Sequence, residues 1–181
     1  MLIDTHAHLY WPDYKDDLDE VIKRSIDAGV TTILNVGVDV EKSKIALEQT
    51  KDKLSKIPNF NAYSTIGIHP HEVVKYSSAP DVSIHDDIEK LEEIYQSASD
   101  KVVAVGECGL DYFLDSDTRQ VTSDTDKEFQ KELFEAQIGL AAELKLPILI
   151  HCRNAWEETF KLITKFQTPN SKLTGLFHSW T

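Results

Sequence analysis

The sequence alternates short apolar segments, rich in β-branched residues, with longer amphipathic segments along its whole length. Two of the short segments, Val102–Val105 and Pro147–Ile150, are apolar at every position, which is typical of parallel strands that are covered on both faces. Regular alternation of strands and helices predicts an α/β protein, either a doubly wound sheet or a (β/α)8 TIM barrel. We expect six strands, at Leu2–His8, Thr31–Val36, Tyr63–His69, Val102–Glu107, Pro147–Cys152 and Leu173–His178.

The segments between the strands carry apolar residues at the spacing of one helical face. The stripes that we expect to pack on the sheet are Leu18, Val21, Ile22 and Ile26, then Ile84, Ile88, Leu91 and Ile94, then Phe129, Leu133, Ala136, Leu140 and Leu144, and finally Trp156, Phe160 and Ile163. A weaker helix is expected around Ile45 and Leu54, and the polar segment Asp111–Asp126 is expected to form a long loop. No linker divides the chain, so residues 1–181 are expected to form a single domain.

Composition narrows the classes of function. The chain has 31 acidic and 19 basic side chains and a formal net charge of −12, so it is a poor candidate for binding nucleic acid through bulk positive charge. No apolar stretch approaches the ~18 residues of a membrane-spanning helix, and the N-terminus lacks the features of a signal peptide, so we expect a cytoplasmic protein without a membrane partner. Cys108 and Cys152 form no disulfide framework, and we interpret both as reduced thiols that face the helices.

Histidines gather at the ends of the expected strands. His6, His8, His69, His151 and His178 all fall at carboxyl ends, and Glu107 ends a further strand. In a parallel α/β fold these ends meet on one face, where active sites are built. Taken alone, His151 or His178 is more often a hydrogen-bonded core residue, but the clustering of all five predicts a metal site.

His6 and His8 flank Ala7 in the first expected strand. The two-residue period of a strand sends both imidazoles to the same side, about 6.6 Å apart along the strand, so both can reach one cation. Zinc, manganese or iron accepts such nitrogen ligands. The alternative is that one or both histidines are ordinary strand residues.

Glu107 ends an apolar strand, and a carboxylate there is costly to bury unless it is paired or binds a metal. One interpretation is an ion pair with Arg153. The sharper interpretation is a ligand that bridges two cations, in which case His151 and His178 would supply the nitrogen ligands of the second cation.

Other side chains are expected to line a pocket beside such a centre. The candidates for substrate binding are His69, His71, Asp111, Tyr112 and Arg153. Arg153 shares the inward face of its strand with His151, and a guanidinium there could hold a phosphate or carboxylate. We assign no role to His85.

Three aromatic residues lie near strand ends, namely Trp11, Tyr112 and Trp180. Each could stack on a nucleobase, although packing in the core is an equal alternative for each. The signatures of dinucleotide dehydrogenases, P-loop NTPases and G-x-S-x-G serine hydrolases are absent from the sequence.

Five motifs follow one another along the chain: Ile-Asp-Thr-His-Ala-His at 3–8, Gly-Ile-His-Pro-His at 67–71, Val-Gly-Glu-Cys-Gly-Leu-Asp-Tyr at 105–112, Ile-His-Cys-Arg at 150–153 and Phe-His-Ser-Trp-Thr at 177–181. In this order they resemble the TatD-related DNases of the amidohydrolase superfamily. The resemblance implies a (β/α)8 barrel with two divalent metal ions (Mg, Mn or Zn) at its mouth. It places His6 and His8 on the first metal, Glu107 between the two metals, and His151 and His178 on the second. It also places His69 close to the phosphate, so that Glu107 and His69 are the implied catalytic residues.

The sequence departs from the family pattern in two respects. Ser179 and Trp180 follow His178, where the family usually has His-Cys-Phe-Thr-Gly. A (β/α)8 barrel typically needs about 250 residues, and the family's last two strands, which include a metal-binding aspartate, have no counterpart in this chain. We therefore expect a barrel truncated after about six strands, closed by a missing C-terminal segment or by self-association. Its open strand edges predict a chain that alone is poorly soluble, oligomeric or weakly active.

The resemblance and the clustered histidines together predict a metal-dependent DNase with a two-metal site. Its substrate is expected to be single-stranded DNA or an exposed end, because no basic stripe with interleaved aromatics tracks a duplex. Two alternatives stay open. One is another hydrolase of the superfamily, acting on an amide, lactone, phosphotriester or aminoacyl ester, and the other is a non-catalytic metal-binding fragment.

Overall fold

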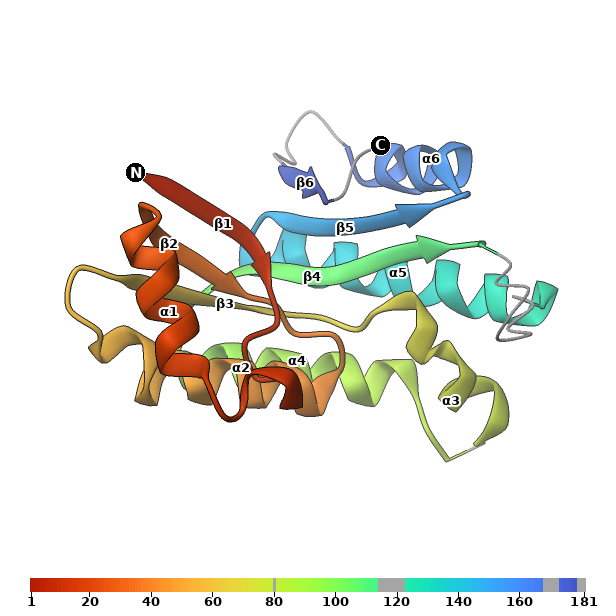
Figure 1. Cartoon of the computed structure of the whole chain (residues 1–181). Coiled ribbons are helices and arrows are strands. Elements are labelled where there is room, and N and C mark those ends of the chain that lie inside the picture. The colour runs from red at the N-terminus through yellow and green to blue at the C-terminus, as the bar shows by residue number, and fades with distance from the viewer. Residues whose placement is uncertain (80, 114–122, 168–172, 179–181) are drawn as a thin grey trace.

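The computed structural model of the chain describes residues 1–79, 81–113, 123–167 and 173–178 (Figure 1). Its strands are β1 Leu2–Ala7, β2 Val30–Asn35, β3 Asn61–Ile66, β4 Val102–Asp111, β5 Ile148–Arg153 and β6 Gly175–Phe177. Its α-helices are α1 Leu18–Asp27, α2 Val40–Asp52, α3 Val74–Ser78, α4 Ile84–Ser97, α5 Asp124–Leu144 and α6 Trp156–Phe166, with short 3-10 turns at Pro12–Tyr14, Leu54–Lys56 and Pro70–Val73.

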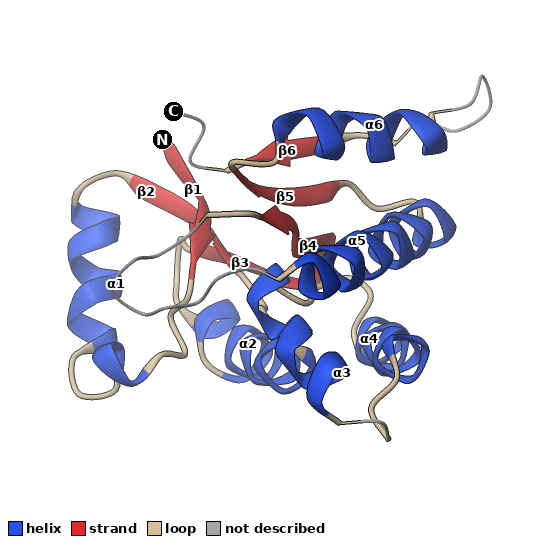
Figure 2. Cartoon of the chain, turned by 90° about the vertical axis from the view of Figure 1, so that its right-hand side faces the viewer, coloured by secondary structure: helices blue, strands red, loops and turns tan. Residues whose placement is uncertain are grey.

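The strands form one sheet in the order β1-β2-β3-β4-β5-β6, and every neighbouring pair is parallel. A doubly wound sheet reverses its strand order at a switch point, whereas strands that follow the order of the chain build a barrel. The helices lie outside the strands and wrap around the convex face of the sheet (Figure 2). The predicted fold class, a (β/α)8-type barrel truncated after six strands, is therefore confirmed.

The curl of the sheet brings distant parts of the chain together. His6 belongs to β1 and His178 directly follows β6, yet their rings stack with centroids 4.3 Å apart and an interplanar angle of 16°. These two strands are the edges of the described sheet. The sheet is thus a half-barrel whose edges approach each other at the carboxyl ends of the strands, where the candidate site lies.

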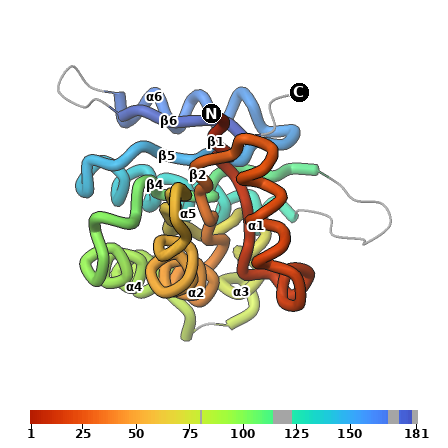
Figure 3. Tube along the Cα trace, turned by 60° about the vertical axis from the view of Figure 1, so that its left-hand side comes forward, coloured from red at the N-terminus to blue at the C-terminus, as the bar shows by residue number. Residues whose placement is uncertain are grey.

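Two apolar clusters hold the helices against the sheet. The larger joins β3, β4 and β5 to α4 and α5 and includes the fully buried side chains of Ile66, Leu91 and Phe134. The smaller joins β1 and β2 to α1 and includes Ile22 and Ile33. Helices α2 and α4 pack side by side on the outside (Figure 3). No described helix has the length and apolar character needed to cross a membrane.

The prediction that Phe160 of α6 packs on the sheet is wrong. Phe160 is 47% exposed, whereas Ala155, Thr159 and Leu162 are buried. These three positions are spaced four and three apart and form the inward face of the helix, one residue away from the stripe that the aromatic residues had indicated. The large side chain of Phe160 contacts Trp156 and Phe177 at the outer edge instead.

The strand boundaries differ from the prediction by one or two residues in most places, and by more at the carboxyl ends of β3 and β4. Strand β3 ends at Ile66 rather than His69, and β4 continues beyond Glu107 to Asp111, pairing residue by residue with β5 up to Arg153. After β3, Gly67 allows the backbone to pass close to Gly106 of β4, because a Cβ atom at position 67 would lie 2.5 Å from the Gly106 backbone. At the other end of the expected loop Asp111–Asp126, α5 begins at Asp124 with a capping box from Ser123, and positions 114–122 lie outside the described residues.

Both cysteines are free thiols. Cys108 is fully buried in the larger cluster, and the Cys152 sulfur lies 3.3 Å from the Thr159 hydroxyl of α6. Burial raises the pKa of each thiol above its usual value. Cys108 thus has the position of a buried small side chain, and Cys152 that of a partly buried one.

Candidate metal centre

Glu107 is the central residue of the candidate site. Its side chain is almost fully buried, and its backbone NH donates to the Gly37 carbonyl. The carboxylate oxygens face different histidines. Oε2 lies 3.2 Å from His6 Nε2 and 3.9 Å from His8 Nε2. Oε1 lies 2.5 Å from His178 Nε2, 3.1 Å from His151 Nδ1 and 3.8 Å from His69 Nε2.

His6 and His8 point to the same side of β1, as the period of the strand predicts, and their Nε2 atoms are 3.2 Å apart. His8 Nδ1 lies 2.8 Å from the Val36 carbonyl oxygen, an acceptor that fixes the ring with its Nδ1–H directed outward. The lone pair on His8 Nε2 then faces Glu107. A backbone carbonyl in this role is the usual outer partner of a metal-binding histidine.

His151 and His178 converge on the other carboxylate oxygen. His151 Nδ1 is 2.9 Å from His178 Nε2, and His151 Nε2 is 3.0 Å from Asp111 Oδ2. A carboxylate only accepts hydrogen bonds, so His151 Nε2 donates its hydrogen to Asp111. This contact directs the Nδ1 atom of His151 toward Glu107. Both imidazole pairs therefore present ring nitrogens to the same carboxylate.

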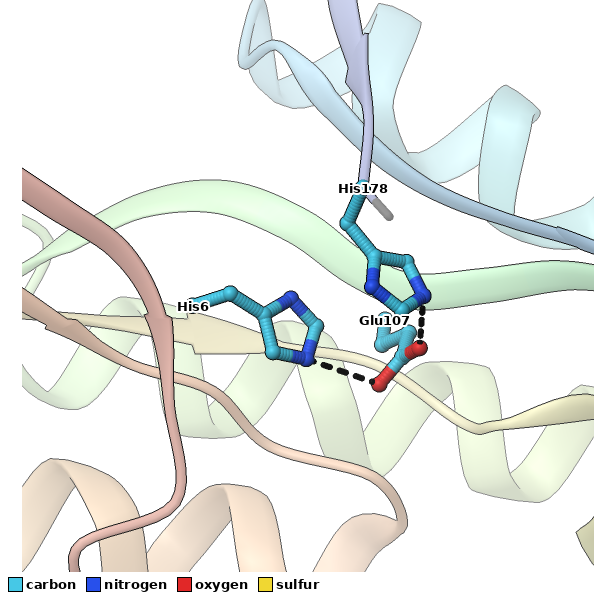
Figure 4. Close-up of side chains that lie close together, drawn as sticks. All are labelled: His6, Glu107 and His178. Carbon is cyan, nitrogen blue, oxygen red and sulfur yellow. Dashed lines mark ion pairs between the residues drawn. The ribbon is translucent and has the colours of Figure 1, made fainter. Parts of the chain in front are cut away.

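These distances fit a divalent cation. Two nitrogen ligands at 2.0 to 2.1 Å from one ion lie about 3.0 to 3.4 Å apart, close to the 3.2 Å and 2.9 Å of the two imidazole pairs. Within the described residues, no lysine or arginine pairs with Glu107, and the buried Nδ1 atom of His6 has no hydrogen-bond partner. Two groups of potential ligands share Glu107: His6 with His178 (Figure 4), and His69 with His151.

Burial and hydrogen bonding shift the pKa values of the carboxylate and the histidines of the site. Burial would raise the pKa of Glu107, but hydrogen bonds from His151, His178 and His6 outweigh this and hold the pKa well below its usual value. Burial lowers the pKa of His8, and lowers that of His69 to about 3, so both are neutral bases at neutral pH. Burial also acts on His151, but hydrogen bonds to Asp111 and Glu107 dominate and raise its pKa to about 9.

Arg153 does not pair with Glu107 but with Asp111, through Nε and Oδ1 at 3.1 Å. Its guanidinium also lies over the Phe113 ring, 4.1 Å from the centroid. The structure therefore gives no support to the alternative that Glu107 is one half of an ion pair with Arg153. Arg153 is half-exposed at the rim of the site, where a phosphate can reach it.

The other predicted pocket residues fall in three places. His69 lies in the loop after β3, held by a hydrogen bond from its NH to the Val38 carbonyl, and faces Glu107. His71 is half-exposed, with Nε2 2.9 Å from Asp111 Oδ2. Tyr112 packs against the larger core cluster beside Lys127 of α5, because alternation along β4 turns it away from the side that Asp111 faces. Trp180 lies outside the described residues.

Asp111 has a different position from the one expected. It is only 1% exposed, and its carboxylate accepts from His71, His151, Arg153 and the backbone NH of Phe113. Burial raises its pKa, but these partners lower it well below the usual value. Asp111 therefore connects the histidine cluster with the side chains at the rim, a role that its place in the sequence did not indicate.

Two glutamines of α5 also escaped the sequence analysis. Gln137 bonds both the NH and the carbonyl of Ile68, at 2.7 and 2.9 Å, and Gln130 does the same for Asp111, at 2.9 and 3.0 Å. Each side-chain amide thus acts as a strand partner for a segment that carries a site residue. The available signal was two amides seven residues apart on the buried face of a helix.

Comparison with known proteins gives consistent results. The family model described as "TatD related DNase" matches residues 3–181. The chain is 35% identical over 181 residues to "Uncharacterized metal-dependent hydrolase YabD" of Bacillus subtilis (strain 168), covering 100% of this chain and 61% of that protein. It is 32% identical over 162 residues to "3'-5' ssDNA/RNA exonuclease TatD" of Shigella flexneri serotype 5b (strain 8401), covering 90% of this chain and 54% of that protein.

A solved structure shows the same arrangement. The crystal structure of YJJV, a TatD homologue from Escherichia coli K12, superposes with a TM-score of 0.76 and 26% sequence identity, over 99% of this chain and 60% of that one. The chain thus spans about three fifths of the length of these relatives. The match of the family model over nearly every residue shows that the chain belongs to the family of TatD-related DNases.

Proposed function

We propose that the protein is a metal-dependent nuclease that hydrolyses DNA phosphodiester bonds with two divalent cations held around Glu107. The observation that carries the proposal is the division of the histidines between the two oxygens of one buried carboxylate. His6 and His8 lie at Oε2, and His151 and His178 lie at Oε1. A carboxylate placed in this way can bridge two ions, each completed by a pair of imidazoles.

Divalent cations at this position would lower the pKa of bound water and neutralise charge on the leaving oxygen. The chain's own residues position the substrate. His69, neutral because of its low pKa, faces the same carboxylate oxygen as His151 and is placed to hydrogen-bond a phosphate. Arg153, anchored by Asp111, supplies a fixed positive charge at the rim, and half-exposed His71 lies beside it.

The proposed substrate is single-stranded nucleic acid or an exposed end of DNA. The net charge of −12 leaves no broad basic surface for a duplex, so cations and Arg153 have to attract the phosphate. The Shigella flexneri relative is named a 3'-5' exonuclease of single-stranded DNA and RNA, which supports the same class of substrate. RNA is accordingly a substrate to be tested beside DNA.

We also propose that the open edges of the half-barrel are covered in the working protein, by further βα units or by a second copy of the chain. Leu2 and Ile3 of β1 and Leu176 of β6 are each about half exposed, and unpaired apolar edge strands promote association. Light scattering of the purified chain tests this. A second copy predicts a dimer, further βα units predict a monomer that binds such a segment when it is supplied, and a monomer that binds neither contradicts the proposal.

The function is tested by incubating the purified chain with labelled single-stranded DNA, duplex DNA and RNA in Mg²⁺, Mn²⁺ or Zn²⁺. We expect cation-dependent cleavage of the single strands that EDTA and Glu107→Gln abolish. Asp87→Asn is the matched control, since Asp87 is a buried carboxylate outside the site. Turnover of an amide, lactone or phosphotriester in place of nucleic acid would favour another hydrolase of the superfamily. Tight metal binding without any turnover would favour a non-catalytic module.

A further inference from the structure

Trp11 lies beside the candidate metal centre and is only partly covered. Its indole stacks on the His8 ring, with centroids 4.7 Å apart and an interplanar angle of 9°, while 43% of the residue stays exposed. The backbone fixes its position: the Trp11 NH donates to the His8 carbonyl, and the Trp11 carbonyl accepts from Tyr14 in the 3-10 turn Pro12–Tyr14. A large aromatic surface is therefore held next to a proposed metal ligand and open to solvent.

This stacking is not needed to orient His8. The His8 ring is already fixed by the Val36 carbonyl oxygen, 2.8 Å from Nδ1, and by the Tyr10 hydroxyl, 3.3 Å from the same atom. Tyr10 in turn donates to the Val36 carbonyl at 2.9 Å. The position of Trp11 thus calls for an explanation other than support of the histidine.

Other aromatic side chains near the strand ends are already engaged. Phe113 is 40% exposed, but its ring contacts the Arg153 guanidinium, 4.1 Å from the centroid, and none of the described histidines of the centre. Tyr112 packs in the core, and Tyr10 is held at Val36. Among the described residues, Trp11 combines exposure with contact to a histidine of the centre.

We propose that Trp11 is the stacking platform for the nucleobase adjacent to the phosphate that is hydrolysed. The inference rests on the proposed function and specifies how that site holds its substrate. Every base has a π-face, so an indole binds nucleotides without regard to sequence, and stacking commonly improves binding about tenfold or more per base. In an acidic chain this contact supplies affinity that a basic surface would otherwise provide.

The test compares an oligonucleotide that carries a normal terminal nucleotide with one that carries an abasic residue at the same position. Wild type, Trp11→Phe, Trp11→Ala and Phe160→Ala are each loaded with Mn²⁺. Binding is followed by fluorescence anisotropy with phosphorothioate-linked oligonucleotides at low temperature, so that no turnover is needed. Phe160 is the matched control, because it is an aromatic residue of similar exposure on α6 whose ring, among the described residues, contacts Trp156 and Phe177 and not the histidines of the centre.

We expect wild type and Phe160→Ala to bind the normal oligonucleotide about tenfold more tightly than the abasic one. Trp11→Ala should lose this preference, and Trp11→Phe should keep most of it. The normal oligonucleotide should also quench an indole emission that Trp11→Phe lacks. Mn²⁺ affinity, measured by calorimetry, should be the same in all four proteins, because the platform contacts the base and does not support His8.

Three results would overturn the inference. Trp11→Ala could retain the full preference for a base, wild type could bind both oligonucleotides equally, or Trp11→Ala could lose Mn²⁺ affinity in parallel with oligonucleotide affinity, which would make Trp11 a support for His8. In each case cation-dependent cleavage by wild type would leave the proposed function intact. Absence of both binding and cleavage of nucleic acid would refute the proposed function together with the inference.

Discussion

Two carboxylates are buried in this half-barrel to nearly the same degree, and their surroundings are opposite in kind. Asp87 of α4 is 5% exposed and Glu107 of β4 is 4% exposed. Asp87 accepts from Lys75 Nζ at 2.7 Å, Lys90 Nζ at 2.9 Å and the Tyr76 hydroxyl at 2.9 Å. Glu107 is instead surrounded by imidazoles from four different segments of the chain.

The difference shows how a structural ion pair is told from a metal centre. Burial raises the pKa of Asp87, but its hydrogen bonds to Lys75, Lys90 and Tyr76 lower it below the usual value, so the charge is balanced by the chain itself. Around Glu107, His8 and His69 are kept neutral by burial. His8 presents the lone pair of Nε2, whereas His69, whose Nδ1 accepts from the His71 NH, presents an uncharged Nε2–H. No lysine or arginine among the described residues pairs with Glu107, and the proton on His151 is a charge that a divalent cation from outside can replace.

The largest effect is therefore expected from Glu107→Gln. Removing the shared charged ligand should weaken binding of Mn²⁺ or Zn²⁺ by more than ~10³-fold, since a cation–ligand interaction of this kind contributes several kcal/mol. Isothermal calorimetry measures the affinity directly. In wild type, metal at 100 times its Kd should also stabilise the fold by about 2.7 kcal/mol, and this gain should vanish in the variant. A variant with wild-type metal affinity would remove Glu107 from the centre.

Asp87→Asn should show the reverse pattern. Without the charge, Lys75 and Tyr76 lose a buried partner, and the free energy of unfolding should fall by about 3 kcal/mol, while metal affinity stays unchanged. Urea unfolding and calorimetry on the same sample measure both quantities. Loss of metal affinity in this variant would show that the two carboxylates are not independent.

The same carboxylate predicts the acid dependence of stability. Because the pKa of Asp87 is lowered in the folded protein, its contribution is fully present above the unfolded pKa, near the ordinary value of 3.8, and is lost as the pH falls through the folded pKa. Below about pH 4, the unfolding free energy of wild type should fall more steeply than that of Asp87→Asn. Equal slopes for the two proteins would show that the pKa of Asp87 is not shifted.

Much of the centre could be predicted because it depends on local geometry. The period of a strand places His6 and His8 on one side, and parallel strands bring their carboxyl ends together, so the clustering with Glu107, His151 and His178 needed no knowledge of loops. The alternation of elements left a doubly wound sheet and a barrel open, and the resemblance to the TatD-related DNases implied the barrel, whose strand order the structure has.

Asp111 and His69 were both named as site residues, but their places in the fold depend on contacts between distant segments and differ from the prediction. Asp111 was expected at the start of a loop, but pairing with β5 extends β4 as far as this residue and buries it against His151. His69 was expected at a strand end, but β3 stops at Ile66, and Gln137 of α5 holds the loop through Ile68. Register between strands and capture of backbone by a helix amide leave no periodic signal in the sequence.

Asp111→Asn tests whether Asp111 supports the metal centre. An asparagine keeps the size of the side chain but weakens the acceptor for His151 Nε2–H, and loss of such an outer partner typically costs 10- to 100-fold in metal affinity. His71→Ala is the matched control, because it removes a different partner of Asp111 and leaves the contact with His151 in place. If both variants bind metal as wild type does, Asp111 serves only the rim.

The smallest expected effect is the pH dependence of metal affinity, which should depend on the site around Glu107 and not on Asp87. Asp111 and Glu107 raise the pKa of His151 to about 9, so at pH 7 the metal-free protein holds a proton that a metal ligand must give up. The affinity for Mn²⁺ should therefore rise about tenfold per pH unit from pH 7 and level off near pH 9, with about one proton released per cation at pH 7. Calorimetry in buffers of different ionisation enthalpy counts that proton. Asp87→Asn should show the same slope, because the ionised Asp87 accepts hydrogen bonds from lysine and tyrosine partners that no cation displaces. An affinity independent of pH over this range would mean that His151 is neutral before the metal arrives.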